Sequence, residues 1–252
     1  MVAYLKNFFI DTGAATQFTA RFFSEVFRPP FEFREFLKQC FIIGYRSLGL
    51  VSITGFIMGL VMTIQSRPTL VEFGAESWLP GMVALSLIKE IAPVITAVIC
   101  AGKVASAMGA ELGSMKVTEQ IDAMEVSGIN PYKYLVVTRV LATTLMIPLL
   151  VIYADVVGMI GSFIAMNIHS DITFFRYFTK AMESIEFIDL VPATIKTFFF
   201  GFFVGMIGCY KGYTASYGTE SVGKAANAAV VSASITIFII DMLAVQITDI
   251  IF

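Results

Sequence analysis

Five charged side chains stand inside long apolar runs of this sequence. They are Lys89, Glu90, Asp155, Lys196 and Asp241. A charged group at the centre of a bilayer costs about 2.5–3.5 kcal/mol on insertion scales, so such groups usually face a cavity or one another. Their depths along the apolar runs predict that all five lie in the same half of a membrane. The chemistry that they could build together is a polar cavity opening on that side.

A structural role is the alternative to a cavity. The two lysines could pair with the carboxylates to hold helices together, or extend their ammonium groups to the membrane surface. We favour the cavity for Lys89, Glu90 and Lys196 and leave both roles open for Asp241. For Asp155, which is expected close to the outer surface, we favour the structural role.

The composition explains why these charges are unusual. The chain has 252 residues, of which 57% are hydrophobic and only 14% are charged, against about 25% charged in ordinary soluble domains. Apolar runs of this length predict transmembrane helices, so the fold class is an all-α integral membrane protein with about five spans. The expected spans are residues 41–64, 82–102, 134–167, 190–210 and the segment that follows Lys224. The pattern Gly55-xxx-Gly59 would allow another helix to approach the first span closely.

The first 40 residues differ from the rest. Aromatic residues recur at helical spacing between Thr16 and Phe27, with Arg21 and Glu25 on the opposite face, which predicts an amphipathic helix lying in the membrane interface. A disordered basic tail is the alternative. We therefore expect one domain, residues 1–252, made of an interfacial region (1–40) and a transmembrane bundle (41–252).

Lysine and arginine residues predict the orientation. If the N-terminus is cytoplasmic, the basic residues within 1–46, 103–139 and 211–224 are all cytoplasmic as well, and the C-terminus is outside. Only Arg67, Arg176 and Lys180 then lie outside, which agrees with the positive-inside rule. The start of the chain lacks the pattern of a cleaved signal peptide.

Residues 109–131 form a polar island between two apolar runs. On a helical projection, Glu111, Asp122 and Glu125 share a face next to an apolar stripe, and Gly128 with Asn130-Pro131 can end the helix. This predicts a cytoplasmic helix over 109–126 with an acidic face. An anionic leaflet attracts basic segments rather than acidic ones, so a protein partner with basic residues is expected here.

Other motifs do not indicate chemistry. Residues 218–225 nearly match the phosphate-binding pattern GxxxxGK[ST], but Ala225 replaces the hydroxyl that would hold Mg²⁺, and we expect a turn between spans. His169 is the one histidine, and Cys40, Cys100 and Cys209 lie far apart, so no metal site is expected. No basic block suggests nucleic acid, and no nucleophile and base pair suggests an enzyme.

Three stretches carry a resemblance to a known family. They are LSLIKEIAPVITA (85–97), AELGSMKVTEQIDAMEVSGINP (110–131) and YLVVTRVLA (134–142). They resemble the MlaE permease family, the membrane subunits of ABC-type lipid transporters that work with MCE proteins. The likeness continues through residues 208–212, 221–225 and the region of Asp241.

The resemblance implies a function. The chain would be a permease that moves phospholipid between the bacterial inner membrane and a periplasmic MCE-protein ring. It would form a homodimer and bind cytoplasmic ABC ATPase subunits, which hold the ATP and Mg, so this chain would have no cofactor and no enzyme activity. Lys89, Glu90, Lys196 and Asp241 fall on matching membrane positions and become candidates for the lipid cavity or for contacts with the ring.

The resemblance also assigns a role to the polar island. Residues 109–126 would be the coupling helix that sits in a groove of the ATPase. The candidate contacts are Glu111, Met115, Thr118, Glu119, Asp122 and Glu125. The direction of transport and the lipid head group stay open.

Two other function classes remain as alternatives. A secondary transporter or channel could use Lys89, Glu90 and Asp241 as an ion relay, and it would need no ATPase. A membrane-bound lipid enzyme is disfavoured for want of a nucleophile and base. Co-purification with an ATP-hydrolysing subunit would separate the first alternative from an ABC permease.

Overall fold

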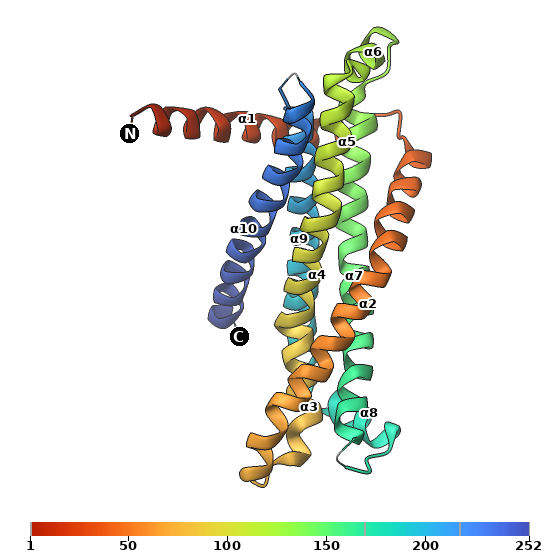
Figure 1. The fold of residues 1–252 in the computed structure, drawn as a ribbon, viewed down its shortest axis with the longest axis vertical. Coiled ribbons are helices and arrows are strands. Elements are labelled where there is room, and N and C mark those ends of the chain that lie inside the picture. Colours follow the sequence, from red (N-terminus) through yellow and green to blue (C-terminus); the bar gives the residue numbers. More distant parts are fainter. Residues whose placement is uncertain (1, 169, 217, 252) are drawn as a thin grey trace.

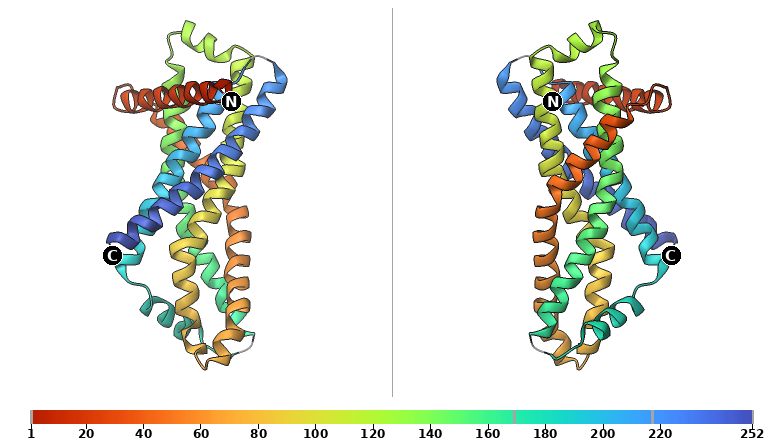
Figure 2. Two further views of the ribbon diagram at one scale, coloured as in Figure 1. Left: turned by 90° about the vertical axis from the view of Figure 1, so that its left-hand side faces the viewer. Right: turned by 90° about the vertical axis from the view of Figure 1, so that its right-hand side faces the viewer.

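The computed structural model of the chain describes residues 2–168, 170–216 and 218–251. Within these residues every regular element is a helix, and five helices are long and apolar enough to cross a membrane (Figure 1). The predicted fold class is confirmed. The long helices run side by side along one axis, with α6 at one end of the molecule and α3 and α8 at the other (Figures 1 and 2).

The N-terminal helix α1 covers Val2–Val26 and lies across the long helices near the α6 end (Figure 1). It starts earlier than the predicted 16–27. Phe22 is buried while Phe23 and Phe27 are exposed, so one aromatic edge packs on the bundle and another faces outward. An apolar helix edge that lies across the spans suits the plane of a membrane interface.

The first span is much longer than expected. Helix α2 runs over Phe33–Glu72, 40 residues, whereas the sequence predicted a span over 41–64 followed by a loop. At 1.5 Å per residue it is about 60 Å long, twice the roughly 30 Å of a hydrocarbon core. The additional turns are held by contacts within the chain, because Leu70 packs on a buried cluster and Arg67 pairs with Glu76 at 2.9 Å.

The second span also extends beyond its predicted limits of 82–102. It is a continuous helical stretch from Glu76 to Val117, interrupted only by changes of pitch. Its parts are a 3₁₀ turn (Glu76–Trp78), α3 (Leu79–Ser86), a π turn (Leu87–Ile91), α4 (Ala92–Cys100), a second π turn (Ala101–Ala105) and α5 (Ser106–Val117).

The remaining elements complete the bundle. They are α6 (Gln120–Val126), a π turn (Tyr132–Val137), α7 (Thr138–Asn167), α8 (Phe174–Glu183), α9 (Phe187–Tyr213) and α10 (Thr219–Ile251). Helix α2 packs along α7, and α9 lies between α7, α5 and α10. The C-terminal end of α10 stops well short of the α3–α8 end (Figure 2).

Glycines allow α2 and α7 to touch. A Cβ atom on Gly59 would lie 1.8 Å from the carbonyl oxygen of Gly158, and one on Gly55 would lie 3.0 Å from that of Ala154. Small residues permit such close helix contacts in membranes. The Gly55-xxx-Gly59 pattern therefore acts within this chain.

Two buried clusters hold the bundle. The larger runs through the α6 half of the long helices, and the smaller joins α3, α7 and α8 at the other end. In the smaller one, the Tyr177 hydroxyl donates to Ser162 Oγ at 2.6 Å, and Ser162 shares a 2.5 Å hydrogen bond with Thr63. This network ties α8 to α7 and α2.

Candidate functional site

Lys196 is the centre of a charged cluster formed by three helices. Its Nζ lies 2.7 Å from Glu90 Oε2 and 2.9 Å from Asp241 Oδ1. The Lys196 side chain is only 5% exposed, whereas that of Glu90 is 44% exposed. The cluster thus joins α9, α10 and the π turn of the second span, and its acidic edge stays open.

A π turn aims two adjacent charges at different partners. Lys89 and Glu90 both belong to the turn Leu87–Ile91, which ends two residues before Pro93. Proline has no N–H and its ring clashes with the carbonyl four residues earlier, so a widened turn at this point relieves the helix. Insertions of this kind are frequent at functional sites.

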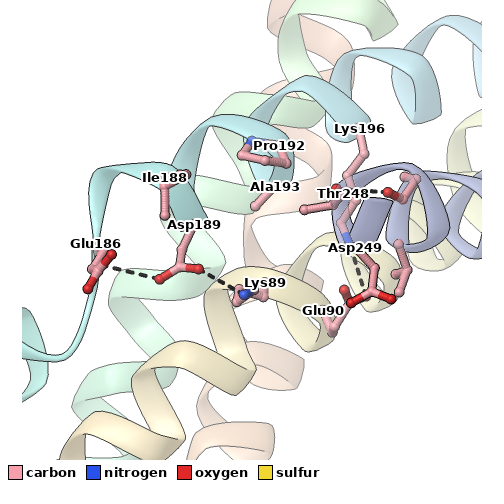
Figure 3. A pocket seen from close by; sticks show the side chains of 12 residues that line it. Lys89, Glu90, Glu186, Ile188, Asp189, Pro192, Ala193, Lys196, Thr248 and Asp249 are labelled. Atoms are coloured by element: carbon pink, nitrogen blue, oxygen red, sulfur yellow. Dashed lines mark hydrogen bonds and ion pairs between the residues drawn. The ribbon is translucent and has the colours of Figure 1, made fainter. Parts of the chain in front are cut away.

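Lys89 contacts the start of α9. Its Nζ lies 2.8 Å from Asp189 Oδ1, and the other Asp189 oxygen accepts the Glu186 backbone N–H at 3.3 Å, closing a capping box at the N-terminus of α9. Figure 3 shows Lys89 pointing to Asp189 while Lys196 points to Glu90. Asp189 was missed from the sequence, although it lies seven residues before Lys196 and so on the same helix face.

These side chains line a cavity of about 470 Å³ between α9, α10 and the π turn. Its lining residues are Lys89, Glu90, Glu186, Ile188, Asp189, Pro192, Ala193, Lys196, Ala244, Val245, Thr248 and Asp249. Polar groups and apolar side chains are mixed along its walls (Figure 3). The structure therefore brings Lys89, Glu90, Lys196 and Asp241 together, three of them directly on one cavity. Asp249 is a further carboxylate that the sequence did not single out, eight residues after Asp241.

Asp155 lies elsewhere. It lines a smaller cavity of about 200 Å³ with Pro148, Thr194 and Thr197. Its Oδ1 atom is buried, and within the described part of the chain it has no hydrogen-bond partner. The expected pairing of Asp155 with a lysine is therefore not found among these residues.

The predicted coupling helix is two helices, which corrects the sequence analysis. Helix α5 ends at Val117 and α6 begins at Gln120, with Glu119 between them in the left-handed region at φ +57°. Residues 109–117 are the end of the second span, because Gly109 and Leu112 pack against α10 and α9. Only α6 projects from the bundle as a separate tip (Figure 1).

Two of the expected docking carboxylates have partners within the chain. Glu111 Oε1 accepts from Arg139 Nη2 at 2.9 Å, and Arg139 is 2% exposed. Asp122 pairs with Lys116 at 2.9 Å across the turn between α5 and α6. These two carboxylates therefore stabilise the turn and its attachment to α7.

The other predicted contacts differ in exposure. Thr118, Glu119 and Glu125 are exposed on the turn and on α6, while Met115 packs against the larger buried cluster. Val126, at the end of α6, is 91% exposed. The free surface of the tip thus combines two carboxylates with an apolar side chain.

The tip is connected to α1. The Tyr132 hydroxyl donates to the Phe18 carbonyl at 2.5 Å, the Arg21 guanidinium lies 4.5 Å from the centre of the Tyr132 ring, and Asn130 donates to Glu25 at 3.2 Å. The segment that follows α6 is therefore fastened to the helix that lies across the bundle.

The phosphate-loop resemblance at 218–225 has no matching structure. Gly218 takes φ +108°, α10 starts at Thr219, and Lys224 pairs with Glu220 on the helix surface. No strand precedes this turn among the residues that the structure describes. The same part of the chain holds no group of three His, Cys, Asp or Glu that could bind a metal ion; His169 lies outside it.

Comparisons with known proteins agree on one kind of protein. The family model of Permease MlaE matches residues 36–247. A probable ABC transporter permease protein of Rickettsia bellii is 36% identical over 227 residues, which cover 90% of this chain and 88% of that protein. One of Synechocystis is 35% identical and covers 93% of this chain and 89% of its own length.

A plant protein is similar as well. The Arabidopsis thaliana protein TRIGALACTOSYLDIACYLGLYCEROL 1, chloroplastic, is 35% identical over 208 residues, which are 82% of this chain and 59% of that protein. All of these similarities include the stretch that carries Lys89, Glu90 and the α5–α6 tip, since each covers at least four fifths of the chain.

Proposed function

Since the chain belongs to the MlaE permease family, we propose that this ABC transporter permease moves phospholipid and draws its energy from partner ATPase subunits. The family and the relatives support a multi-pass permease subunit. The lipid substrate, the assembly and the mechanism below are our proposal.

The cavity beside Lys196 is the observation that carries the lipid assignment. Its walls combine two ion-paired lysines and four carboxylates, which suit a polar head group, with apolar surface from Ile188, Pro192 and Val245 for the start of an acyl chain. A phospholipid carries both features at the junction of head group and tails. A relative whose name contains that of a galactosyl glycerolipid supports a glycerolipid as well.

The α6 tip is the proposed joint to the ATPase. Glu119, Glu125 and Val126 form its free surface, which suits a groove with basic residues and an apolar floor. ATP binding would draw two ATPase subunits together and move each tip. Because α5, α4 and α3 form one continuous helical stretch, the motion would reach the π turn that carries Lys89 and Glu90.

The proposed assembly is a homodimer in a bacterial inner membrane below a periplasmic MCE-protein ring. The N-terminus and the tip would be cytoplasmic and the C-terminus periplasmic, following the distribution of lysine and arginine. Exposed apolar side chains along α10 offer a surface for the second copy, including Val231, Ile235, Phe238 and Met242. Movement of the tips would narrow the cavity, and the lipid would pass between it and the ring.

The lipid assignment is tested by filling the cavity. Ala244 lines it from α10, and Ala244→Phe should exclude lipid without affecting the tip. Lipid mass spectrometry of the purified complex should then show a loss of bound phospholipid, and transport should stop. Val71→Phe is the control, since Val71 is 45% exposed on α2 and lies outside the cavity lining. Equal bound lipid in both variants would contradict the proposal.

The joint is tested by charge reversal. Glu119→Lys/Glu125→Lys should reduce ATPase co-purification while the permease still inserts. The control, Glu72→Lys/Glu183→Lys, makes the same charge change on exposed residues at the opposite end. Transport that persists with an inactive ATPase would instead support an ion relay through Lys89, Glu90 and Asp241.

A further inference from the structure

A second groove lies where α1 ends, α2 begins and the third span starts. It encloses about 230 Å³. Its lining residues are Val26, Phe31, Glu32, Phe33, Phe36, Lys133, Val137, Thr138 and Leu141. Most of this wall is aromatic or aliphatic, and only two lining side chains carry a charge. The groove is separate from the cavity at Lys196, with which it shares no residue.

Lys133 is a buried cation without a carboxylate partner. The residue is 7% exposed, its Nζ donates to the Arg28 carbonyl, and the Phe31 ring centre is 5.5 Å away. Among the side chains that the structure describes, no carboxylate oxygen lies within 4 Å of it. Burying an unpaired ammonium group is costly, so an anionic ligand in the groove would stabilise it.

Glu32 is the opposite charge on the same groove. It is half-buried and pairs with no basic group within the described residues. The neighbouring charges are already engaged, because Arg28 pairs with Glu25 at 3.8 Å and Glu35 with Lys38 at 3.4 Å. The exposed Arg34 is the remaining charge nearby. The wall of the groove is itself almost wholly apolar, and Lys133 and Glu32, which form no ion pair with each other, bring one cation and one anion to its edge.

The groove lies at the level expected of a membrane surface. Helix α1 crosses the bundle there, and the apolar part of α2 begins there (Figure 1). Phospholipid phosphates occupy this level, while the acyl chains start just below it. An apolar groove with charges on its rim fits that layering.

We propose that this groove binds a zwitterionic phospholipid with a primary amine. Its phosphate accepts from Lys133, its ammonium group donates to Glu32, and the start of one acyl chain lies against Phe33, Phe36 and Leu141. A purely apolar helix from a partner protein would leave Lys133 without a counter-charge, so it suits the groove less well. This lipid would be a bound component of the permease, and it does not depend on which substrate occupies the other cavity.

The test uses a single fluorescent reporter. Trp78 is the only tryptophan, so Trp78→Phe combined with Phe33→Trp places the one indole in the groove wall. The purified permease is reconstituted in vesicles of phosphatidylcholine that contain increasing fractions of acyl-brominated phosphatidylethanolamine or phosphatidylglycerol. Bromine quenches the indole at short range. We expect stronger quenching at equal fraction with brominated phosphatidylethanolamine than with brominated phosphatidylglycerol, because the latter has no ammonium group for Glu32.

Two variants separate the contributions of the charges. Lys133→Met should lower the relative affinity for both brominated lipids about ten- to a hundredfold, as expected for one charge-assisted hydrogen bond. Glu32→Gln should leave phosphatidylglycerol binding intact or stronger and remove the preference for phosphatidylethanolamine. Lys224→Met is the control, because Lys224 is exposed and pairs only with Glu220 among the described side chains.

Three outcomes would overturn the proposal. One is quenching that follows only the bulk fraction of brominated lipid, as expected for ordinary surrounding lipid. Another is a Lys133→Met variant that quenches like Lys224→Met. The last is a reporter that no brominated lipid quenches, which would indicate that a protein helix covers the groove. If Lys133→Met does not fold, the Glu32→Gln comparison still decides, since an unchanged preference for phosphatidylethanolamine contradicts the proposal.

Discussion

Lys196 joins α9 to α10 through a 2.9 Å contact between its Nζ and Asp241 Oδ1. The same ammonium group lies 2.7 Å from Glu90. One buried cation therefore serves two carboxylates from two other helices. Within this trio the negative charge is in excess, so the loss of the lysine leaves the carboxylates facing each other.

Lys196→Met should destabilise the protein more than its size suggests. Removing one partner from a buried pair leaves uncompensated charge, and we expect a loss of about 2 kcal/mol, reduced from higher values because Glu90 is partly exposed. The measurement is thermal unfolding of the purified protein in detergent. Adding Asp241→Asn should recover part of the loss, and additive losses would contradict the shared cluster. The control, Lys89→Met, removes a more exposed pair and should cost less than about 1 kcal/mol.

Gly59→Ala should separate α2 from α7. The new Cβ would lie 1.8 Å from the Gly158 carbonyl oxygen, which belongs to the backbone and cannot turn away. Overpacking of this kind costs about 1–3 kcal/mol or more. Gly49→Ala on the same helix meets nothing within 4 Å and should be neutral or slightly stabilising. Equal unfolding midpoints for the two variants would show that the close approach of α2 and α7 does not contribute to stability.

Glu111→Gln should affect the stability of the permease more than its binding to the ATPase. Its carboxylate is the charged partner of the buried Arg139, whose Nε has no hydrogen-bond partner among the described residues. We expect a loss of about 2 kcal/mol in unfolding measurements. Glu125→Gln on the exposed tip should leave unfolding unchanged. If Glu111→Gln keeps wild-type stability but fails to bind the ATPase, Glu111 belongs to the docking surface instead.

Tyr177→Phe should loosen α8. The variant removes the hydroxyl that donates to Ser162, and we expect a loss of about 1 kcal/mol. Burial raises the pKa of Tyr177 above its ordinary value near 10. An unfolded chain would therefore release this proton at lower pH than the folded one, and the stability from Tyr177 is lost as the pH rises above about 10. The stability gap between wild type and Tyr177→Phe should shrink there, and a constant gap between pH 8 and 11 would contradict this.

Much of the charged cluster could be predicted because membrane depth follows from position along an apolar run. Lys89, Glu90, Lys196 and Asp241 are each placed by such a run, and the structure brings them together. Asp189 and Asp249 stand near the ends of their runs, where charges are common, so they were missed. Asp189 lies seven residues before Lys196, and Asp249 lies eight residues after Asp241. This helical spacing was the signal that could have identified them.

The division of the acidic helix could not be predicted in the same way. Thr118 and Glu119 are compatible with an uninterrupted helix, yet Glu119 takes the left-handed conformation where α5, which packs on α9 and α10, ends and the chain turns. The Glu111–Arg139 pair joins residues 28 positions apart, and no local pattern indicates it. The length of α2 likewise depends on Leu70 and Arg67 finding partners beyond the apolar run.

The contacts between Tyr132, Phe18 and Arg21 have a mechanical consequence. They fasten α1 to the segment that follows α6, so a tilt of the tip would move α1 with it. The bilayer would then resist each movement of the tip elastically. Membrane tension and head-group crowding would set the size of this resistance, and with it the rate of transport.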